Sequence, residues 1–371
     1  YKNLAKSFSN YTWYPDTLSV GRSTVAGELA ILSGAINSPH ILNERVKKNN
    51  GEETISSVWE KSFNNLGNLV NKKSGVLNIW SPQVAYTKGC ESILNRLIDI
   101  KIDPKVNCID ESEILESYFY RKNFSAIPVE QTYIFGIFYL LPPFAKKLFY
   151  KSYVWMGLQR RHQLKNIFSD VEINNREQFK LSSAVNNIRF EDLKVPTVTY
   201  IRSNYPHYPF ATKQNCIPIH NLKKLFGNDL SGYDFSYYHN MRCTLEEVAK
   251  LNIKLSELNQ QENTVVILVS DHDVDIGQFY HPQSLLLIKH LLNENSLNRN
   301  DSLMTNADII GIVNCYLNEK FNCVPNIRKR VRYTSFTPSH IEFQYKNKFK
   351  IDKMFQVNGT MFKKENWLQI K

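Results

Sequence analysis

A nearly continuous apolar run, TVVILVS at residues 264–270, constrains the fold of this chain more than any other feature. Such a run is what a parallel strand requires when it is buried on both faces of a sheet. It follows residues 238–259, where the spacing of Leu and Val predicts a long amphipathic helix, and it precedes a polar loop. This order predicts an α/β fold with a mostly parallel sheet and helices on both faces.

The rest of the chain continues this alternation. Helices are expected at 28–34, 56–71, 91–100 and 307–317, and strands at 76–80, 195–203 and 284–290. From about residue 330, short alternating segments predict a small antiparallel piece. We therefore expect one large α/β domain over 1–330, with a β-rich subdomain over 331–371 packed on it. The polar stretch 42–54 is expected to be a flexible loop.

Composition limits the partners of the chain. Its 371 residues include 46 Lys and Arg against 35 Asp and Glu, a formal net charge of +11. This surplus favours nucleic acid, phosphorylated substrates or an anionic membrane surface. No RNP, helix-turn-helix or zinc-finger sequence is present, so we expect no nucleic-acid partner. The hydrophobic fraction of 42% excludes disordered and collagen-like chains.

The six cysteines leave two interpretations open. They are too sparse for a disulfide scaffold and form no CxxC motif. Cys315 and Cys323 are close enough in sequence for a local bridge, which would indicate an oxidising compartment. Alternatively, all six are buried thiols.

Residues 132–158 alternate aromatic residues and lysines around a Pro-Pro break. The segment is too interrupted to span a bilayer, which takes about 20 apolar residues. One interpretation is a helical hairpin in the core. The other is a helix in the membrane interface, with its lysines near the headgroups.

The strongest chemical signal is Ser270-Asp271-His272, which directly follows the apolar run. Ligands of open α/β sheets bind beyond the carboxyl ends of strands. Asp271 and His272 can supply an oxygen and a nitrogen ligand to one divalent metal ion. The alternative is a polar turn in which the Asp caps the following segment.

Thr24 is the second candidate, because it follows Gly-Arg-Ser and precedes a short apolar helix. The start of a helix favours an anion such as a phosphoryl group. Thr24 can be the N-cap of this helix, or a nucleophile activated by a metal ion. No P-loop and no G-x-S-x-G elbow is present.

Two histidines complete the candidate site. His207 lies between prolines after the strand expected at 195–203, where an imidazole can hold a phosphate oxygen. His281 follows the Asp-His pair and can reach the same crevice. A surface loop histidine is the alternative interpretation of His207.

The order of these motifs resembles the alkaline phosphatase/sulfatase superfamily. Within it, the chain is similar to the membrane-anchored branch of lipoteichoic acid synthases and phosphoethanolamine or phosphoglycerol transferases. The resemblance rests on residues 8–34, on Ser270-Asp271-His272-Asp273, similar to the family's SDHG, and on His207-Tyr208-Pro209-Phe210. It covers roughly residues 1–320, so the domain over 1–330 is expected to be the sulfatase-like catalytic domain.

The resemblance implies a role for each candidate residue. Thr24 would be the nucleophile and a ligand of Zn or Mn, together with Asp271 and His272. His207 would bind phosphoryl oxygens, and His281 matches a further substrate histidine of some family members. The sulfatase signature, Cys or Ser followed by x-P-x-R, is absent at 21–30, which argues against sulfate esters.

The resemblance also implies a reaction and a cellular location. The enzyme would transfer a phosphoethanolamine- or phosphoglycerol-type headgroup from a phospholipid to a glycan or lipid acceptor, through a phosphothreonine. Its partners would be anionic phospholipid headgroups and an envelope glycan or lipid at the membrane surface. It would act in the periplasm or on the extracellular face of the cytoplasmic membrane, anchored by an upstream transmembrane region.

Two departures from the family support alternatives. No strand that ends in an acidic metal ligand is expected before Thr24, so either the first strand lies upstream of this chain or the protein lacks it. Asp273 replaces the usual Gly after the Asp-His pair. The alternatives are an inactive sulfatase-fold protein that binds lipid or glycan, and a phospho- or sulfo-ester hydrolase of the same fold.

Overall fold

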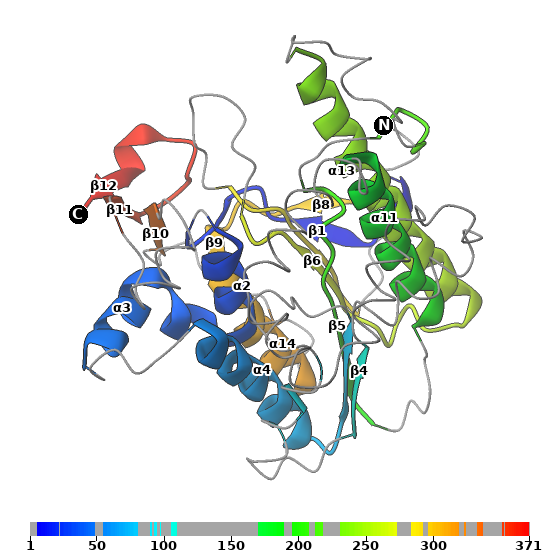
Figure 1. The fold of residues 1–371 in the computed structure, drawn as a ribbon, viewed down its shortest axis with the longest axis horizontal. Coiled ribbons are helices and arrows are strands. Elements are labelled where there is room, and N and C mark those ends of the chain that lie inside the picture. Colours follow the sequence, from blue (N-terminus) through cyan, green and yellow to red (C-terminus); the bar gives the residue numbers. More distant parts are fainter. Residues whose placement is uncertain are drawn as a thin grey trace, which may run out of the picture. The chain divides into compact units, whose positions relative to one another are not determined.

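The computed structural model describes residues 6–21, 23–48, 55–80, 90, 93–94, 97, 105–109, 170–188, 195–207, 212–217, 231–272, 283–291, 296–318, 323, 332–336, 351 and 353–370. The chain divides into two compact units. Figure 1 draws the described helices and strands. Unit 1 comprises 1–110, 188–202 and 248–371, and unit 2 comprises 111–187 and 203–247.

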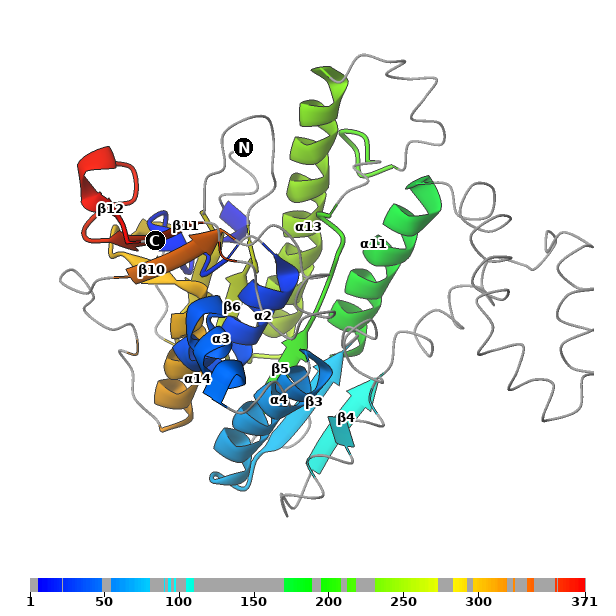
Figure 2. The ribbon, with the colours of Figure 1, turned by 60° about the vertical axis from the view of Figure 1, so that its left-hand side comes forward.

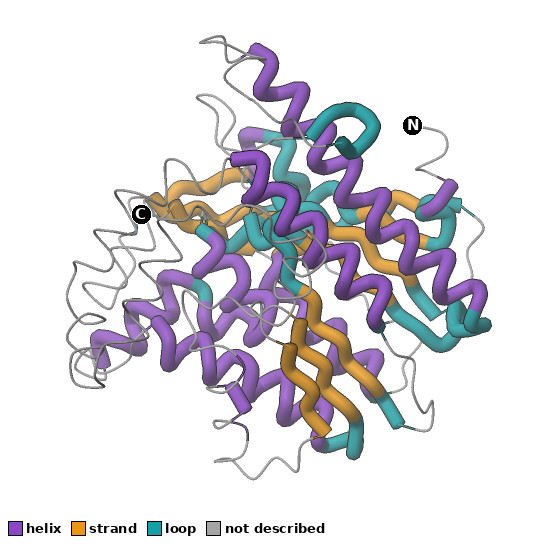
Figure 3. The backbone as a smooth tube through the Cα atoms, turned by 45° about the vertical axis from the view of Figure 1, so that its right-hand side comes forward, coloured by secondary structure: helices purple, strands orange, loops and turns teal. Residues whose placement is uncertain are grey.

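A parallel sheet contributes to the hydrophobic core of unit 1. Its strands lie in the order β4 (Lys105–Ile109), β3 (Val76–Trp80) and β5 (Thr197–Ile201), and both pairings are parallel. Figure 3 shows these strands side by side. Because parallel strands end at the same edge, Trp80 and Ile201 are register partners there. The strands expected at 76–80 and 195–203 are therefore confirmed.

Helices α2 (Thr24–Ser33), α4 (Ile55–Asn71) and α14 (Ile309–Leu317) pack with this sheet into one hydrophobic core (Figure 2). Val58, Trp59 and Phe63 of α4 are fully buried, as their helical spacing predicts. The α/β fold, with parallel strands and packed helices, is confirmed. Much of the helix expected at 91–100 lies outside the described residues.

A second sheet in unit 1 has the order β6-β7-β1-β8. Its strands are β6 (Val266–Val269), β7 (Leu286–Lys289), β1 (Tyr11–Trp13) and β8 (Asn298–Arg299). The strands expected at 264–270 and 284–290 both exist, but β6 pairs with β7 in antiparallel direction. The expectation of parallel pairing at this strand was wrong, because an apolar run indicates burial and carries no direction.

The amino-terminal segment pairs with parts of the chain that are distant in sequence. β1 lies between β7 and β8, and β2 (Thr17–Leu18) pairs in parallel with β9 (Met304–Thr305). A short 3-10 helix, η3 (Asn306–Asp308), leads from β9 into α14. The segment that leads to Thr24 is thereby held by residues beyond 283.

The carboxyl-terminal residues form an antiparallel sheet, β10 (Arg332–Phe336), β11 (Lys353–Val357) and β12 (Trp367–Gln369). A short 3-10 helix, η4 (Lys364–Asn366), precedes β12. Asp16 binds this region, since its Oδ1 accepts hydrogen bonds from Thr360 Oγ1 at 2.8 Å and from the Met361 backbone N–H at 3.1 Å. The small antiparallel piece predicted near the end is confirmed.

The prediction of a loop at 42–54 is wrong over the first part of this stretch. Residues Pro39–Lys48 form helix α3, which follows the short 3-10 helix η1 (Gly34–Asn37). Leu42 and Val46 are four residues apart and buried in the unit 1 core, so this apolar contact outweighs the polar composition. Residues 49–54 lie outside the described part.

Unit 2 contains α11 (Asp170–Asn187), the segment 203–217 where described, and most of α13 (Ser231–Glu257). Asn240 Nδ2 donates a hydrogen bond of 3.2 Å to the Tyr205 carbonyl, which ties the segment to α13. No helix in the described residues is long and apolar enough to cross a membrane. The segment 132–158 lies outside the described residues, so neither interpretation of it is tested.

All six cysteines form disulfides, Cys90–Cys108, Cys216–Cys243 and Cys315–Cys323. The local bridge expected from the spacing of the last pair is present. The interpretation as six buried thiols is wrong. A chain with three disulfides is typical of an oxidising environment.

Candidate active site at the start of helix α2

Thr24 is the first residue of α2, and it is not the cap of this helix. Ser23 is the N-cap, since its side chain accepts a hydrogen bond from the Ala26 backbone N–H. The capping role considered for Thr24 is therefore taken by its neighbour. Thr24 Oγ1 is instead 3.2 Å from His272 Nε2, with which it shares a hydrogen bond. Two residues 248 positions apart thus meet, as the motif order predicts.

Asp271 and His272 follow β6 and are held by the backbone around them. Ser270 continues the pairing with the next strand, since its N–H donates to the Leu285 carbonyl at 3.0 Å. The Asp271 carbonyl accepts hydrogen bonds from Ser19 Oγ at 2.9 Å and from Asn306 Nδ2 at 2.6 Å. Because Asn306 is fully buried, this carbonyl is fixed in place.

Gly27 lets the Asp271 backbone approach α2. A Cβ atom at this position would collide with the carbonyl group of Asp271. Gly27 lies one turn into the helix that begins at Thr24, so the close approach brings the Asp-His pair to the helix start. The glycine is required here for space.

Two side-chain oxygens lie near the same nitrogen of His272. His272 Nε2 is 3.2 Å from Thr24 Oγ1 and 3.6 Å from Asp271 Oδ2. In a tetrahedral zinc site with bonds of about 2.0–2.2 Å, ligand atoms are about 3.3–3.6 Å apart. Both separations from His272 Nε2 are close to these values, so His272 can share a divalent ion with Thr24 and with Asp271.

The same distances argue against a serine-protease type of relay. In such a relay, the acid contacts the ring nitrogen opposite the one that faces the nucleophile. Here Asp271 Oδ2 and Thr24 Oγ1 both lie near Nε2 of His272. Asp271 is therefore not placed as the acid of such a relay.

A buried ionic group that the sequence analysis missed lies beside these residues. Glu28 follows Thr24 by one helical turn and is 3% exposed. Its Oε2 accepts a hydrogen bond of 3.0 Å from Arg202 Nε, and its Oε1 accepts one from the Tyr200 hydroxyl. A Glu in an otherwise apolar helix and an Arg directly after a strand were the available signals.

Electrostatics link this group to Asp271. Burial raises the pKa of Glu28, an effect that Arg202 opposes and the nearby Asp271 charge reinforces. Burial disfavours the charged form of Arg202, but Glu28, Tyr200 and Asp271 together raise its pKa. Burial and the Glu28 charge raise the pKa of Tyr200 as well, so its hydroxyl stays protonated and donates.

The two remaining histidines are not brought to Thr24 by the described contacts. His207 belongs to unit 2, where it is exposed and its backbone N–H donates to the Asn204 carbonyl at 2.8 Å. His281 and Asp273 lie outside the described residues. Their roles stay predictions.

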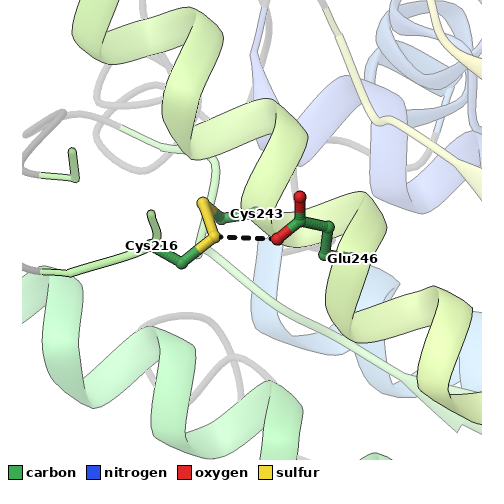
Figure 4. A group of neighbouring side chains, drawn as sticks. All are labelled: Cys216, Cys243 and Glu246. Atoms are coloured by element: carbon green, nitrogen blue, oxygen red, sulfur yellow. Dashed lines mark hydrogen bonds between the residues drawn. A yellow bond between two sulfur atoms is a disulfide. The ribbon is translucent and has the colours of Figure 1, made fainter. Parts of the chain in front are cut away.

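A second group has the composition of a metal site. Among the described residues, Cys216, Cys243 and Glu246 are the set of His, Cys, Asp or Glu side chains whose ligand atoms lie within 4.8 Å of one another. Figure 4 shows the two cysteines joined in a disulfide, with Cys216 Sγ 3.1 Å from Glu246 Oε2. Oxidised sulfurs are not thiolates, so this group does not bind a metal ion in this state.

Neither a scan of protein-family models nor a search of curated proteins finds a match. Solved structures do match. Phosphonate monoester hydrolase of Agrobacterium radiobacter is 10% identical, with a TM-score of 0.50 over 99% of this chain and 83% of its own. Lipoteichoic acid synthase LtaP of Listeria monocytogenes is 11% identical, with a TM-score of 0.48 over 99% and 78%.

A protein of the alkaline phosphatase superfamily from Vibrio parahaemolyticus is 10% identical, with a TM-score of 0.42 over 98% of this chain and 71% of its own. At such identities, likeness to a solved structure concerns the fold alone. The match to phosphonate monoester hydrolase supports this likeness. The chain therefore has the α/β fold of the alkaline phosphatase/sulfatase superfamily, as the order of its three motifs predicts.

Proposed function

We propose that the protein is a divalent metal-dependent enzyme that transfers a phosphoryl-linked headgroup through a covalent phosphothreonine at Thr24. The contacts of His272 Nε2 with Thr24 Oγ1 and with Asp271 Oδ2 carry this proposal. Zn²⁺ or Mn²⁺ bound there would lower the pKa of the Thr24 hydroxyl and stabilise charge on the phosphoryl oxygens. Both metals accept this set of oxygen and nitrogen ligands.

Thr24 would act first on the donor, a phospholipid with a phosphoethanolamine- or phosphoglycerol-type headgroup. Its Oγ1 forms a bond to phosphorus, while the bond between phosphorus and the diacylglycerol oxygen breaks. The hydroxyl proton passes to water, and the diacylglycerol oxygen takes a proton from water. Its place at the start of α2 supports this step, since backbone N–H groups there favour an anionic phosphoryl group.

An acceptor hydroxyl oxygen of a glycan or lipid then bonds to phosphorus and loses its proton to water. The bond between phosphorus and Thr24 Oγ1 breaks, and the Thr24 oxygen takes a proton from water. Asp271 and His272 hold their positions through both steps, because the Asp271 carbonyl is fixed by Ser19 and Asn306. The side chains of Asp271 and His272 are 31% and 19% exposed, so an acceptor can reach the site. Water as the acceptor would make the enzyme a hydrolase.

The place of action that we propose is outside the cytoplasm, in the periplasm or on the outer face of the cytoplasmic membrane. Three disulfides support an oxidising compartment. The net charge of +11 supports work on anionic lipid headgroups. In this proposal, His207 and His281 bind the substrate.

The test is to trap the intermediate. The protein is mixed with phosphatidylethanolamine vesicles or with bis(p-nitrophenyl) phosphate, quenched with acid, digested and analysed by mass spectrometry. We expect an adduct on the peptide that contains Thr24. Thr24→Ala should lose the adduct and lower turnover about 10³-fold or more, with its fold intact. Thr197→Ala, at an exposed threonine of β5, is the control.

The outcomes separate the alternatives. Full activity of Thr24→Ala would overturn the proposal. An acceptor-linked product indicates a transferase, whereas free phosphoethanolamine or p-nitrophenyl phosphate alone indicates a hydrolase. Lipid binding without metal and without turnover would indicate an inactive protein of this fold.

A further inference from the structure

We propose that the carboxyl-terminal residues 362–370 dock the protein on an anionic phospholipid bilayer. Three exposed apolar side chains, Phe362, Leu368 and Ile370, and the neighbouring Lys363 and Lys364 form what we call the docking surface. The inference rests on the proposed function and deepens it, because it names the part of the chain that brings the enzyme to its phospholipid donor.

Large apolar side chains are exposed more densely here than elsewhere in the described part of the chain. Phe362, Leu368 and Ile370 are 60%, 58% and 45% exposed. They are three of the nine exposed large hydrophobic residues among the described ones, yet they lie within nine consecutive positions. Single exposed apolar residues are normal on a protein surface, whereas a group of them indicates contact with a partner or a membrane.

The core of unit 1 does not use the apolar residues of β12. Val357 and Trp367 are register partners in β11 and β12. Val357 is fully buried in an apolar cluster, and Trp367 packs against this cluster. Successive side chains of a strand point to opposite faces, so Leu368 and Ile370 share the face of β12 opposite to Trp367. These two side chains are therefore available for a contact outside the chain.

The turn that contains Phe362 folds back on β12. Trp367 Nε1 donates a hydrogen bond of 2.7 Å to the Met361 carbonyl, which keeps Phe362 close to the strand. The same turn is tied to the amino-terminal segment, because Asp16 Oδ1 accepts hydrogen bonds from Thr360 Oγ1 and the Met361 backbone N–H. The docking surface is thus held on unit 1 before it meets a bilayer.

The charge of this stretch complements an anionic surface. Lys363 and Lys364 directly follow Phe362 and are exposed. The described residues 353–370 include three lysines and one acidic residue, Glu365. Each lysine near an anionic membrane increases binding about 5-fold. Lysines beside exposed aromatic and aliphatic side chains are the composition of a surface that lies in the membrane interface.

A bilayer matches this charge better than a second copy of the chain does. A symmetric dimer through the docking surface would place the same patch of both copies face to face. Lys363 and Lys364 of the two copies would then approach each other, and like charges repel. Lipid phosphates instead neutralise these lysines, while the acyl region accepts the apolar side chains.

Docking of this kind serves transfer from a lipid donor. Apolar insertion and charge attraction are each weak, and the charge attraction is screened by salt, so the two contributions act together. An enzyme held at the bilayer meets its donor at a high effective concentration. The docking surface should therefore matter for a lipid substrate and not for a water-soluble one.

The test measures binding of the whole chain to sedimented vesicles of phosphatidylcholine, with and without phosphatidylglycerol. The two test variants are Leu368→Ser/Ile370→Ser and Lys363→Gln/Lys364→Gln. We expect each to bind the anionic vesicles about 10-fold more weakly than wild type. Ile253→Ser is the control, at an apolar residue of α13 that is 59% exposed, and it should bind as wild type.

Wild-type vesicle affinity of either double variant overturns the inference. A change from dimer to monomer in Leu368→Ser/Ile370→Ser, measured by light scattering and without weaker vesicle binding, also overturns it and assigns the surface to a second copy. The substituted side chains are exposed, so the variants should fold. If Leu368→Ser/Ile370→Ser does not fold, Phe362→Ser is tested with the same criterion.

Activity separates failure of this inference from failure of the proposed function. Both double variants should turn over bis(p-nitrophenyl) phosphate as wild type does, and should transfer phosphoethanolamine from anionic vesicles about 10-fold more slowly. A Thr24 adduct together with wild-type vesicle binding in the variants contradicts docking alone. Weakened vesicle binding in the variants, with no adduct on Thr24 of the wild type, contradicts the covalent mechanism and retains the docking surface.

Discussion

Two groups of ligand-type side chains in this protein differ in what they can bind. Cys216, Cys243 and Glu246 in unit 2 have the composition of a zinc site, yet the two sulfurs are joined to each other. Thr24, Asp271 and His272 in unit 1 include only one strong nitrogen ligand, and the oxygens of Thr24 and Asp271 both lie near Nε2 of that histidine.

The difference shows that metal binding depends more on the oxidation state of the ligand atoms and on where they point than on residue type. Sulfurs joined in a disulfide are no longer thiolates, which are the form of cysteine that binds metal ions. An Asp-His pair and a threonine bind an ion only when their backbone holds the ligand atoms close together, and Gly27 and Asn306 fix the Asp271 backbone in unit 1. The following predictions test this contrast.

Removal of a ligand from the unit 1 group should have the largest effect. We expect His272→Ala to lose its bound metal and to lower kcat/KM at least about 100-fold, since even loss of an outer-shell partner costs about 10–100-fold. Elemental analysis and assays with bis(p-nitrophenyl) phosphate measure both. A full equivalent of metal in His272→Ala would contradict the assignment.

The matched change in unit 2 is Cys216→Ser/Cys243→Ser, which should leave metal content unchanged. It should lower the free energy of unfolding by about 3–4 kcal/mol, because the bridge closes a loop with a sequence separation of 27. Cys315→Ser/Cys323→Ser, with a separation of 8, should lower it by about 2–3 kcal/mol. Urea unfolding gives these values.

Gly27→Ala should have the next largest effect on activity. The added Cβ displaces the Asp271 backbone and moves His272 away from Thr24, while alanine preserves the helix. We expect kcat/KM to fall about 10–100-fold, as for a catalytic group misplaced by about 1 Å. Weaker metal binding, measured by competition with a chelator, should accompany this loss.

Gly311→Ala is the control for this substitution. Gly311 lies in α14, and a Cβ atom there meets no atom within 4 Å. Activity should be unchanged, and the protein should gain up to about 1 kcal/mol of stability. Equal losses of activity in both variants would show that helix glycines act through stability alone.

The smallest expected effect is the pH dependence of the free energy of unfolding. Burial raises the pKa of Glu28 above its ordinary value of 4.5, so the folded chain holds this proton more tightly than the unfolded chain. The free energy of unfolding should therefore decrease as pH rises from 4.5 through the raised pKa. Glu28→Gln should flatten this slope in urea titrations at several pH values, whereas Glu365→Gln, at an exposed residue, should retain it.

Local pattern predicted much of the fold. The strand at 76–80 and the helix at 56–71 follow from apolar spacing and from the break at Gly75, because these signals act over a few residues. The direction of β6 and the helix at 39–48 were not predicted. The first depends on its partner strand, and the second depends on a core that buries Leu42 and Val46.

Prediction of the candidate site from the sequence was limited in the same way. The sequence places Asp271 and His272 after a buried strand and Thr24 at a helix start, which is enough to expect that they meet. Glu28 and Arg202 were missed, since a buried ion pair between distant residues leaves no periodic signal. The disulfides Cys90–Cys108 and Cys216–Cys243 escaped prediction for the same reason.

The pairing of the amino-terminal segment sets an order of assembly during synthesis. β1 and β2 pair only with strands beyond residue 283 among the described residues, and Asp16 is satisfied by Thr360 and Met361. Thr24 leaves the ribosome long before these strands, so its framework forms only after β9 has emerged. Contacts of such long range fold slowly, so the start of α2 is set in place late.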